Sequence, residues 1–83
     1  MGDAGSGSLE QHETPDGFQV FFWKTGEWNY SPSDIEAELP DGTRLRAVEQ
    51  LSGRRLGFEQ QLPRGTWILL RGKPTWGPVG EGR

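Results

Sequence analysis

The sequence predicts an all-β protein: a small antiparallel meander of five or six strands that forms a barrel or roll, with disordered N- and C-terminal tails. Two observations lead to this prediction. Short runs of β-branched and aromatic residues recur through the middle of the chain. Turn residues, mainly Gly, Pro, Asp and Ser, separate these runs at intervals of about 8–12 residues.

The foldable part of the 83-residue chain is predicted to be one small β domain, residues 17–71. Residues 1–16 form an acidic, Gly/Ser-containing head with too little apolar area to offset the entropy of ordering it, so we expect disorder there. Residues 72–83 form a Gly/Pro-rich tail. A domain of about 55 residues is marginally stable by area scaling, so aromatic residues are important for its core.

The first expected element is a hairpin within and around FFWKTGEWNY, residues 21–30, which holds five aromatic side chains in ten positions. With a two-residue turn at Thr25–Gly26, the facing pairs are Trp23 with Trp28 and Phe21 with Tyr30. Because side chains alternate along a strand, one face carries Phe21, Trp23, Trp28 and Tyr30, and the other carries Phe18, Val20 and Phe22. A four-residue loop or a one-residue slip would change this partition.

The next element, IEAELPDGTRLRA (residues 35–47), has the most specific turn signal in the chain. Pro40 and Asp41 suit the centre of a type I turn, and Gly42 suits the left-handed position that closes a bulged hairpin. The predicted pairs are Leu39–Thr43, Glu38–Arg44, Ala37–Leu45 and Glu36–Arg46, with opposite charges on one face. A short helix competes with this hairpin, since SDIE (residues 33–36) matches a capping box, but Pro40 would end it after about six residues.

The turn signature recurs, because ELPDGTRL (38–45) and QLPRGTWI (61–68) share Leu, Pro, Gly and Thr in register. We therefore expect a second bulged hairpin, with the pairs Leu62–Thr66, Gln60–Ile68 and Phe58–Leu70. Its last strand is apolar on both faces, which predicts a central or doubly covered position. Between the hairpins, Ser52–Gly53 is expected to connect two strands, and Gly57 to mark a bulge or bend.

The residue inventory argues against an enzyme. The chain has no cysteine and a single histidine, His12, which lies in the predicted head. The expected domain therefore lacks the residues for a Cys/His zinc site or for a Cys–His or Ser–His nucleophile pair. Glu36 and Glu38 are more simply the solvated side of a hairpin than a glycosidase pair. We expect no catalytic residues, no cofactor and no metal.

The aromatic hairpin is the main functional candidate. A domain this small needs only one of its two apolar faces for a core, so the other would be a surplus apolar surface of the kind that marks binding sites. This predicts an adaptor-like module that binds a protein or peptide partner through Phe21, Trp23, Trp28 and Tyr30. The alternative is that Trp23 and Trp28 form the core, and the sequence leaves the inward face open.

The distribution of charge supports a second hypothesis, nucleic-acid binding. After Gly42 the domain has six arginines against Glu49 and Glu59, although an ordinary mixed surface explains this asymmetry more simply. The arginines available for phosphate contacts would be Arg54, Arg55, Arg64 and Arg71. The formal net charge of −3 opposes this hypothesis. A third alternative is a structural subunit of an assembly, with an open edge strand leading to oligomers.

Two further expectations concern the tail and the location of the chain. Trp76, within KPTWGP (73–78), is expected to fold back and seal one end of the barrel; docking in a groove of a partner is the alternative. No run approaches the ~20 apolar residues of a membrane helix, and no secretory signal is visible. A cytoplasmic chain without membrane contact is therefore expected.

Overall fold

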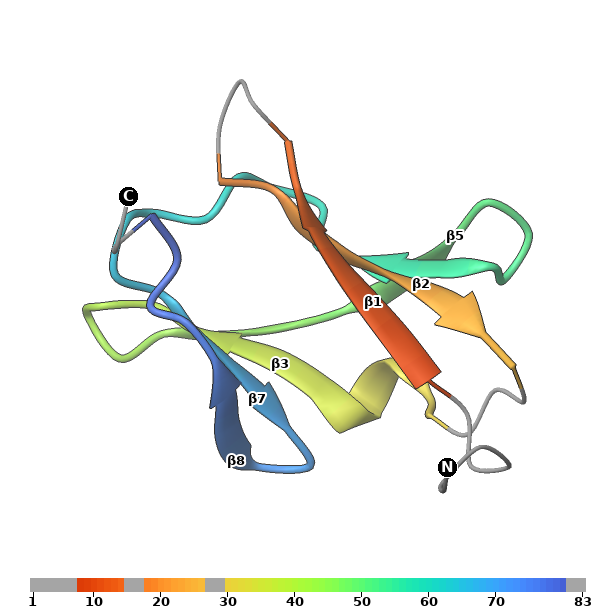
Figure 1. Cartoon of the computed structure of the whole chain (residues 1–83). Helices are drawn as coiled ribbons and strands as arrows, with labels where there is room; N and C mark the ends of the chain where they lie inside the picture. Colours follow the sequence, from red (N-terminus) through yellow and green to blue (C-terminus); the bar gives the residue numbers. More distant parts are fainter. Residues whose placement is uncertain (1–7, 15–17, 27–29, 81–83) are drawn as a thin grey trace.

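The computed structural model describes residues 8–14, 18–26 and 30–80, and these form an all-β fold. Eight strands of the described part make two four-stranded antiparallel sheets (Figure 1). The first sheet has the order β1 (Ser8–Glu13), β2 (Val20–Thr25), β6 (Arg55–Gly57) and β5 (Val48–Gln50). The second has the order β4 (Arg44–Arg46), β3 (Ile35–Glu38), β7 (Trp67–Leu70) and β8 (Lys73–Trp76). A 3₁₀ helix, η2 (Pro32–Asp34), leads into β3.

The predicted all-β class with antiparallel strands is confirmed. Of the finer prediction, five or six strands forming a barrel or roll, the number of strands is wrong, since the described strands number eight, and the barrel is wrong because the two sheets do not close. The edge strands β1 and β8 come from the segments expected to be tails. The sheets are joined at Ala47, the single residue between β4 and β5, whose amide donates to the carbonyl of Ile35 at 3.0 Å. The chain therefore passes from one sheet to the other within one nearly continuous extended segment.

Strand β1 lies within residues 1–16, where the sequence predicts a disordered head. It pairs with β2 along its whole length, from Ser8 opposite Thr25 to Glu13 opposite Val20. An edge strand needs one hydrogen-bonded neighbour and little apolar area of its own, and Leu9 is enough to pack against the core. Apolar content alone therefore underestimates the tendency of this segment to join a sheet. The head residues 1–7 lie outside the described residues.

The C-terminal segment also joins the fold. Trp76 ends β8 and its ring centroid lies 4.9 Å from that of Phe22, so the expectation that Trp76 folds back onto the domain is confirmed. Val79 is 1% exposed and belongs to the core. Its amide donates to the carbonyl of Thr66 at 2.7 Å, and its carbonyl accepts from Gly65 at 2.8 Å. The tail predicted at 72–83 thus supplies part of the core.

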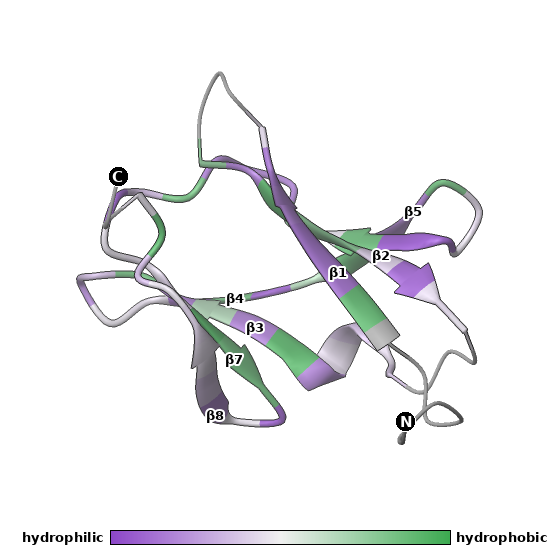
Figure 2. Ribbon diagram, viewed as in Figure 1, coloured by the Kyte–Doolittle hydropathy of each residue, from purple (hydrophilic) through white to green (hydrophobic). Residues whose placement is uncertain are grey.

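The core lies between the two sheets and draws on both. Its fully buried hydrophobic members are Val20, Phe22, Ile35, Ala37, Ala47, Leu56, Phe58, Leu62, Ile68 and Val79. Figure 2 shows hydrophobic residues along β7, whereas β3 alternates between hydrophobic and hydrophilic positions. The expected central position of the last apolar strand is confirmed, because β7 pairs with β3 on one side and with β8 on the other.

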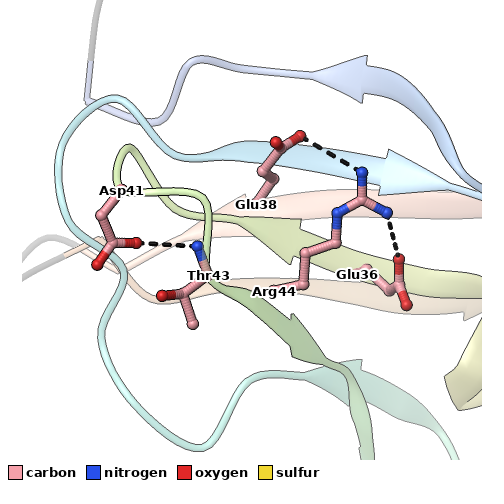
Figure 3. A network of polar contacts seen from close by, with 5 residues as sticks. All are labelled: Glu36, Glu38, Asp41, Thr43 and Arg44. Atoms are coloured by element: carbon pink, nitrogen blue, oxygen red, sulfur yellow. Dashed lines mark hydrogen bonds and ion pairs between the residues drawn. The ribbon is translucent and has the colours of Figure 1, made fainter.

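The hairpin predicted at 35–46 is confirmed residue by residue. Glu36 pairs with Arg46, Ala37 with Leu45 and Glu38 with Arg44. The Asp41 carboxylate accepts the Thr43 amide at 2.9 Å and thereby closes the turn (Figure 3). Arg44 alone makes the charge contacts drawn there, since its Nη1 lies 3.5 Å from Glu36 and its Nη2 lies 3.9 Å from Glu38. The alternative helix beginning at SDIE (33–36) does not form beyond the short 3₁₀ helix η2. There the carboxylate of Asp34 accepts the Ser31 amide at 2.9 Å.

The two other predicted hairpins are wrong in their pairing. Strand β2 pairs with β1 and β6, so Phe21 lies opposite His12 and Gly57 rather than Tyr30. Trp28, the expected partner of Trp23 in this hairpin, lies outside the described residues. In the second repeat, Gly65 has φ of 94°, as does Gly42, but the Leu62 amide donates to Phe18 and not to Thr66. The Phe18 carbonyl thus accepts the amide that the predicted hairpin would use. The strands before and after this turn, β6 and β7, belong to different sheets.

The connection between β5 and β6 is a turn, as the sequence predicts. Leu51, Ser52 and Gly53 all have positive φ, and the Arg54 amide donates to the Leu51 carbonyl at 3.0 Å. The expected turn at Ser52–Gly53 is therefore confirmed. Gly57 ends β6 at a close approach to β2, where an added Cβ would lie 3.2 Å from that of Phe21.

Candidate functional site

The candidate site is the outer surface of the first sheet, which we call the aromatic face. It is defined by Glu10, His12, Phe21, Trp23, Gln50 and Arg55. Strand alternation along β2 creates this surface, because Val20 and Phe22 are fully buried between the sheets. Phe21 and Trp23 therefore point away from the core and are only partly covered.

Cross-strand register brings residues from four strands together on the aromatic face. His12 of β1 lies opposite Phe21, and Glu10 lies opposite Trp23. On the other side of β2, Arg55 of β6 lies opposite Trp23. Gln50 of β5 is the partner of Arg55 in turn. Side chains directly opposite each other on one face of an antiparallel pair are in contact range, so these residues form one cluster.

The rings of the aromatic face pack edge to face and in stacks. The Phe21 and Trp23 ring centroids lie 5.9 Å apart at 88°. The His12 ring stacks on Phe21 at 5.5 Å and approaches Trp23 edge-on at 6.5 Å. In the two edge-on pairs the positive ring edge meets the negative face, which is favourable for aromatic rings. The result is a surface on which three rings contact one another.

Arg55 completes the cluster from the β6 side. Its guanidinium carbon lies 4.5 Å from the Phe21 ring centroid and 5.5 Å from that of Trp23, within the range of a cation–π interaction. Its Nε donates to Oε1 of Gln50 at 3.1 Å, and its Nη2 donates to the same oxygen. Because β1 and β6 flank β2, the Phe21 ring has His12 on one side and Arg55 on the other.

The structure separates the four residues predicted as one binding row. Phe21 and Trp23 share the aromatic face, while Trp28 lies outside the described residues. Tyr30 is partly buried just before η2, where Arg71 lies over its ring at 4.7 Å. Arg71 also approaches the Asp34 carboxylate at 3.8 Å. Tyr30 therefore belongs to a separate contact with the turn between β7 and β8.

The four arginines of the nucleic-acid hypothesis are not gathered into one patch. Arg54 and Arg55 lie at the hairpin between β5 and β6 in the first sheet. Arg64 precedes β7 and Arg71 follows it, so these two flank opposite ends of a strand in the second sheet. Of the four, only Arg55 belongs to the aromatic face.

Sequence reasoning missed four members of the aromatic face: it placed neither Glu10 nor His12 nor Gln50 there, and it did not predict Arg55 as a ring contact. The sequence places His12 in the expected head and suggests Arg55 only as a phosphate contact. No local signal joins positions 12, 21 and 55, because their proximity depends on the order of the strands. The alternation Glu-x-His in residues 10–12 is the one available clue, since it places both side chains on one face of a strand.

The described residues meet the requirements of neither a metal site nor a membrane-spanning helix. Within residues 8–14, 18–26 and 30–80, no group of three or more His, Cys, Asp or Glu side chains is placed to hold a metal ion. None of the helices in this same part of the chain is long and apolar enough to span a membrane. Comparisons with protein-family models, with curated proteins and with solved structures gave no match.

Proposed function

We propose that this protein is a non-enzymatic interaction module that binds a protein or peptide partner through its aromatic face. The observation that supports the proposal is the packing of Phe21 and Trp23 into a rigid ring cluster on the side of β2 opposite the core. Partly exposed aromatic side chains that already pack against their neighbours lose less entropy on binding than free ones, and such residues are typical interface hot spots.

The surroundings of the rings also suit a protein partner. Polar side chains border them on two strands, Glu10 and His12 on β1 and Gln50 on β5. An apolar centre with a polar rim is the usual anatomy of a protein interface. Sheet edges lie on both sides, since β1 and β5 end the first sheet. A partner segment could therefore pair with an edge strand and place its side chains over the rings.

Nucleic acid is the weaker candidate for this surface. Bases stack on free ring faces, but His12 and Arg55 already cover the Phe21 ring from both sides. The remaining arginines are dispersed, and the chain carries a net charge of −3. Phosphate neutralisation, the main source of affinity for nucleic acid, is therefore poorly supplied.

The test is selection of a random-peptide phage library on the full chain, followed by titration of synthetic copies of the selected peptides. Trp23→Ala should weaken binding by about thirtyfold or more, which corresponds to a hot spot of about 2 kcal/mol. Trp67→Ala is the matched control, because Trp67 is 40% exposed but lies on the second sheet. It should leave affinity unchanged.

A second measurement does not depend on how well the variants fold. Amide chemical-shift changes of the wild-type protein on peptide addition should concentrate in β1, β2 and β6. Shifts confined to β3 and β7, equal losses for both Trp variants, or failure to select any peptide would contradict the proposal. A stable oligomer by light scattering, with the aromatic face protected in it, would favour the structural-subunit alternative. Oligonucleotide binding at low salt would favour the nucleic-acid alternative.

A further inference from the structure

We infer that Arg55 is a receptor for an acidic side chain, so that the partner of the aromatic face is a peptide segment carrying Asp or Glu. This inference rests on the proposed function and names the chemistry that the partner must bring. Its basis is the Arg55 guanidinium, which is partly buried and contacts two aromatic rings. Its hydrogen-bond partner is the neutral side chain of Gln50 and not a carboxylate.

The position of Arg55 is fixed from two directions. The guanidinium lies against the rings of Phe21 and Trp23, with its central carbon 4.5 and 5.5 Å from the two ring centroids. The side-chain oxygen of Gln50 accepts from both Nε and Nη2. An arginine normally loses considerable rotamer entropy when it binds a ligand. Here that ordering is already provided by the fold, which favours tight recognition of an incoming anion.

The charge of Arg55 has no carboxylate partner within the described part of the chain. Arg44, in contrast, lies within 4 Å of the carboxylates of Glu36 and Glu38. The acid on the aromatic face, Glu10, instead faces His12 at 3.6 Å. A partly buried cation that lacks a counterion among the described residues is a site that an external carboxylate would complete.

The unused donors of Arg55 have the geometry for this task. A guanidinium carries five N–H groups, and Gln50 accepts from one on Nε and one on Nη2. Both hydrogens of Nη1 and the second hydrogen of Nη2 have no acceptor within residues 8–14, 18–26 and 30–80. This end of the fork can bind the two oxygens of a carboxylate in parallel, the pairing for which arginine is best suited. The aromatic rings beside it would contact the apolar part of the same segment.

A phosphate could use the same donors, but the surroundings favour a carboxylate on a peptide. A nucleic-acid strand would need further cations along its backbone, and Arg64 and Arg71 lie in the other sheet, at opposite ends of β7. A single acidic side chain next to apolar groups needs only the one guanidinium and the rings. The selected peptides should therefore contain Asp or Glu at a constant distance from an apolar residue.

The experiment is a double-mutant cycle between the full chain and an acidic peptide selected on it. Replacement of the peptide Glu by Gln should weaken binding to the wild type about tenfold or more. Arg55→Gln should cause a similar loss with the Glu peptide and no further loss with the Gln peptide. Arg54→Gln, an exposed neighbour, is the matched control and should leave both affinities unchanged.

A second variant preserves the fold and tests the same contact. Gln50→Glu has nearly the same shape and places an internal carboxylate on Arg55. It should weaken the acidic peptide about tenfold, weaken the Gln peptide by clearly less, and keep or raise the melting temperature.

The outcomes separate this inference from the proposed function. Peptides that require Trp23 but are indifferent to Arg55, to Gln50→Glu and to their own acidic residues would overturn the inference and leave the function standing. Peptides indifferent to Trp23 would overturn both. Binding of a single-stranded oligonucleotide that Arg55→Gln abolishes, without acidic-peptide binding, would overturn the inference in favour of phosphate recognition.

Discussion

Phe22 and Trp23 are adjacent in β2 but are predicted to differ sharply when each is replaced by alanine. Phe22 is fully buried between the sheets, and its ring centroid lies 4.9 Å from that of Trp76. Trp23 lies on the outer surface of the same strand, among Phe21 and Arg55. The two substitutions therefore remove rings of similar character from opposite sides of one strand.

The expected costs follow from these environments. Truncation of a buried Phe costs about 3–5 kcal/mol, because a cavity is left in the core. A chain of 83 residues has a total stability of about 4–12 kcal/mol. Phe22→Ala should therefore lower the melting temperature by about 12–40 °C. Trp23→Ala loses its ring pair with Phe21, a more distant one with His12 and one cation–π contact. Together these contribute about 1.5–3 kcal/mol and correspond to about 6–24 °C.

Thermal and urea denaturation followed by circular dichroism would measure both variants, with the wild type and Trp67→Ala as references. Phe22→Ala should be the less stable variant and should bind peptide only to the extent that it remains folded. Trp23→Ala should remain folded at room temperature and still lose binding. A Trp23→Ala variant as unstable as Phe22→Ala would mean that Trp23 is part of the core, and the reasoning from alternation would fail.

Three further predictions concern stability. Gly80→Ala should destabilise the fold by about 1–2 kcal/mol or more in urea denaturation, since φ is +80° and the new Cβ would lie 2.9 Å from the ring of Phe18; an unchanged midpoint would contradict this packing. Leu51→Asn should stabilise by about 0.5–1 kcal/mol, because Leu51 is 55% exposed with φ of 53° and Asn tolerates this conformation better; a loss of stability would refute the argument. The hydrogen bond from the Thr43 amide lowers the pKa of Asp41 below 3.8, so its stabilising effect is present above that pH and is lost as pH falls through the folded value. Asp41→Asn should therefore flatten the fall in stability between about pH 5 and 2, and identical pH profiles would count against it.

The local elements of this fold could be predicted because their determinants are close in the sequence. The turn at Pro40–Gly42 contains its own type I centre and its left-handed glycine, and the register of its two strands follows at once. Alternation in β2 likewise follows from strand geometry, whichever strands pair with it. Both predictions depend only on residues that lie within about ten positions of one another in the sequence.

Pairing between distant segments could not be read in the same way. The two Leu-Pro-x-Gly-Thr segments have the same turn residues and the same φ at their glycines, Gly42 and Gly65. In the first, the Leu39 amide bonds to Thr43 within the hairpin; in the second, the Leu62 amide bonds to Phe18, 44 positions away (62 minus 18). Similar local signals thus lead to different structures. The first turn has Asp41, whose carboxylate accepts the Thr43 amide, where the second has Arg64, and in the second the distant Phe18 carbonyl accepts the Leu62 amide.

By itself, then, the sequence determined the all-β class, the hairpin at 35–46 and the opposition of Phe22 to Phe21 and Trp23. Only the tertiary structure decided that residues 8–13 complete the first sheet and that His12 and Arg55 flank the same ring. The physical reason is that turn preference and alternation act over a few bonds. The order of strands in a sheet, in contrast, is a choice among competing long-range hydrogen bonds and buried contacts.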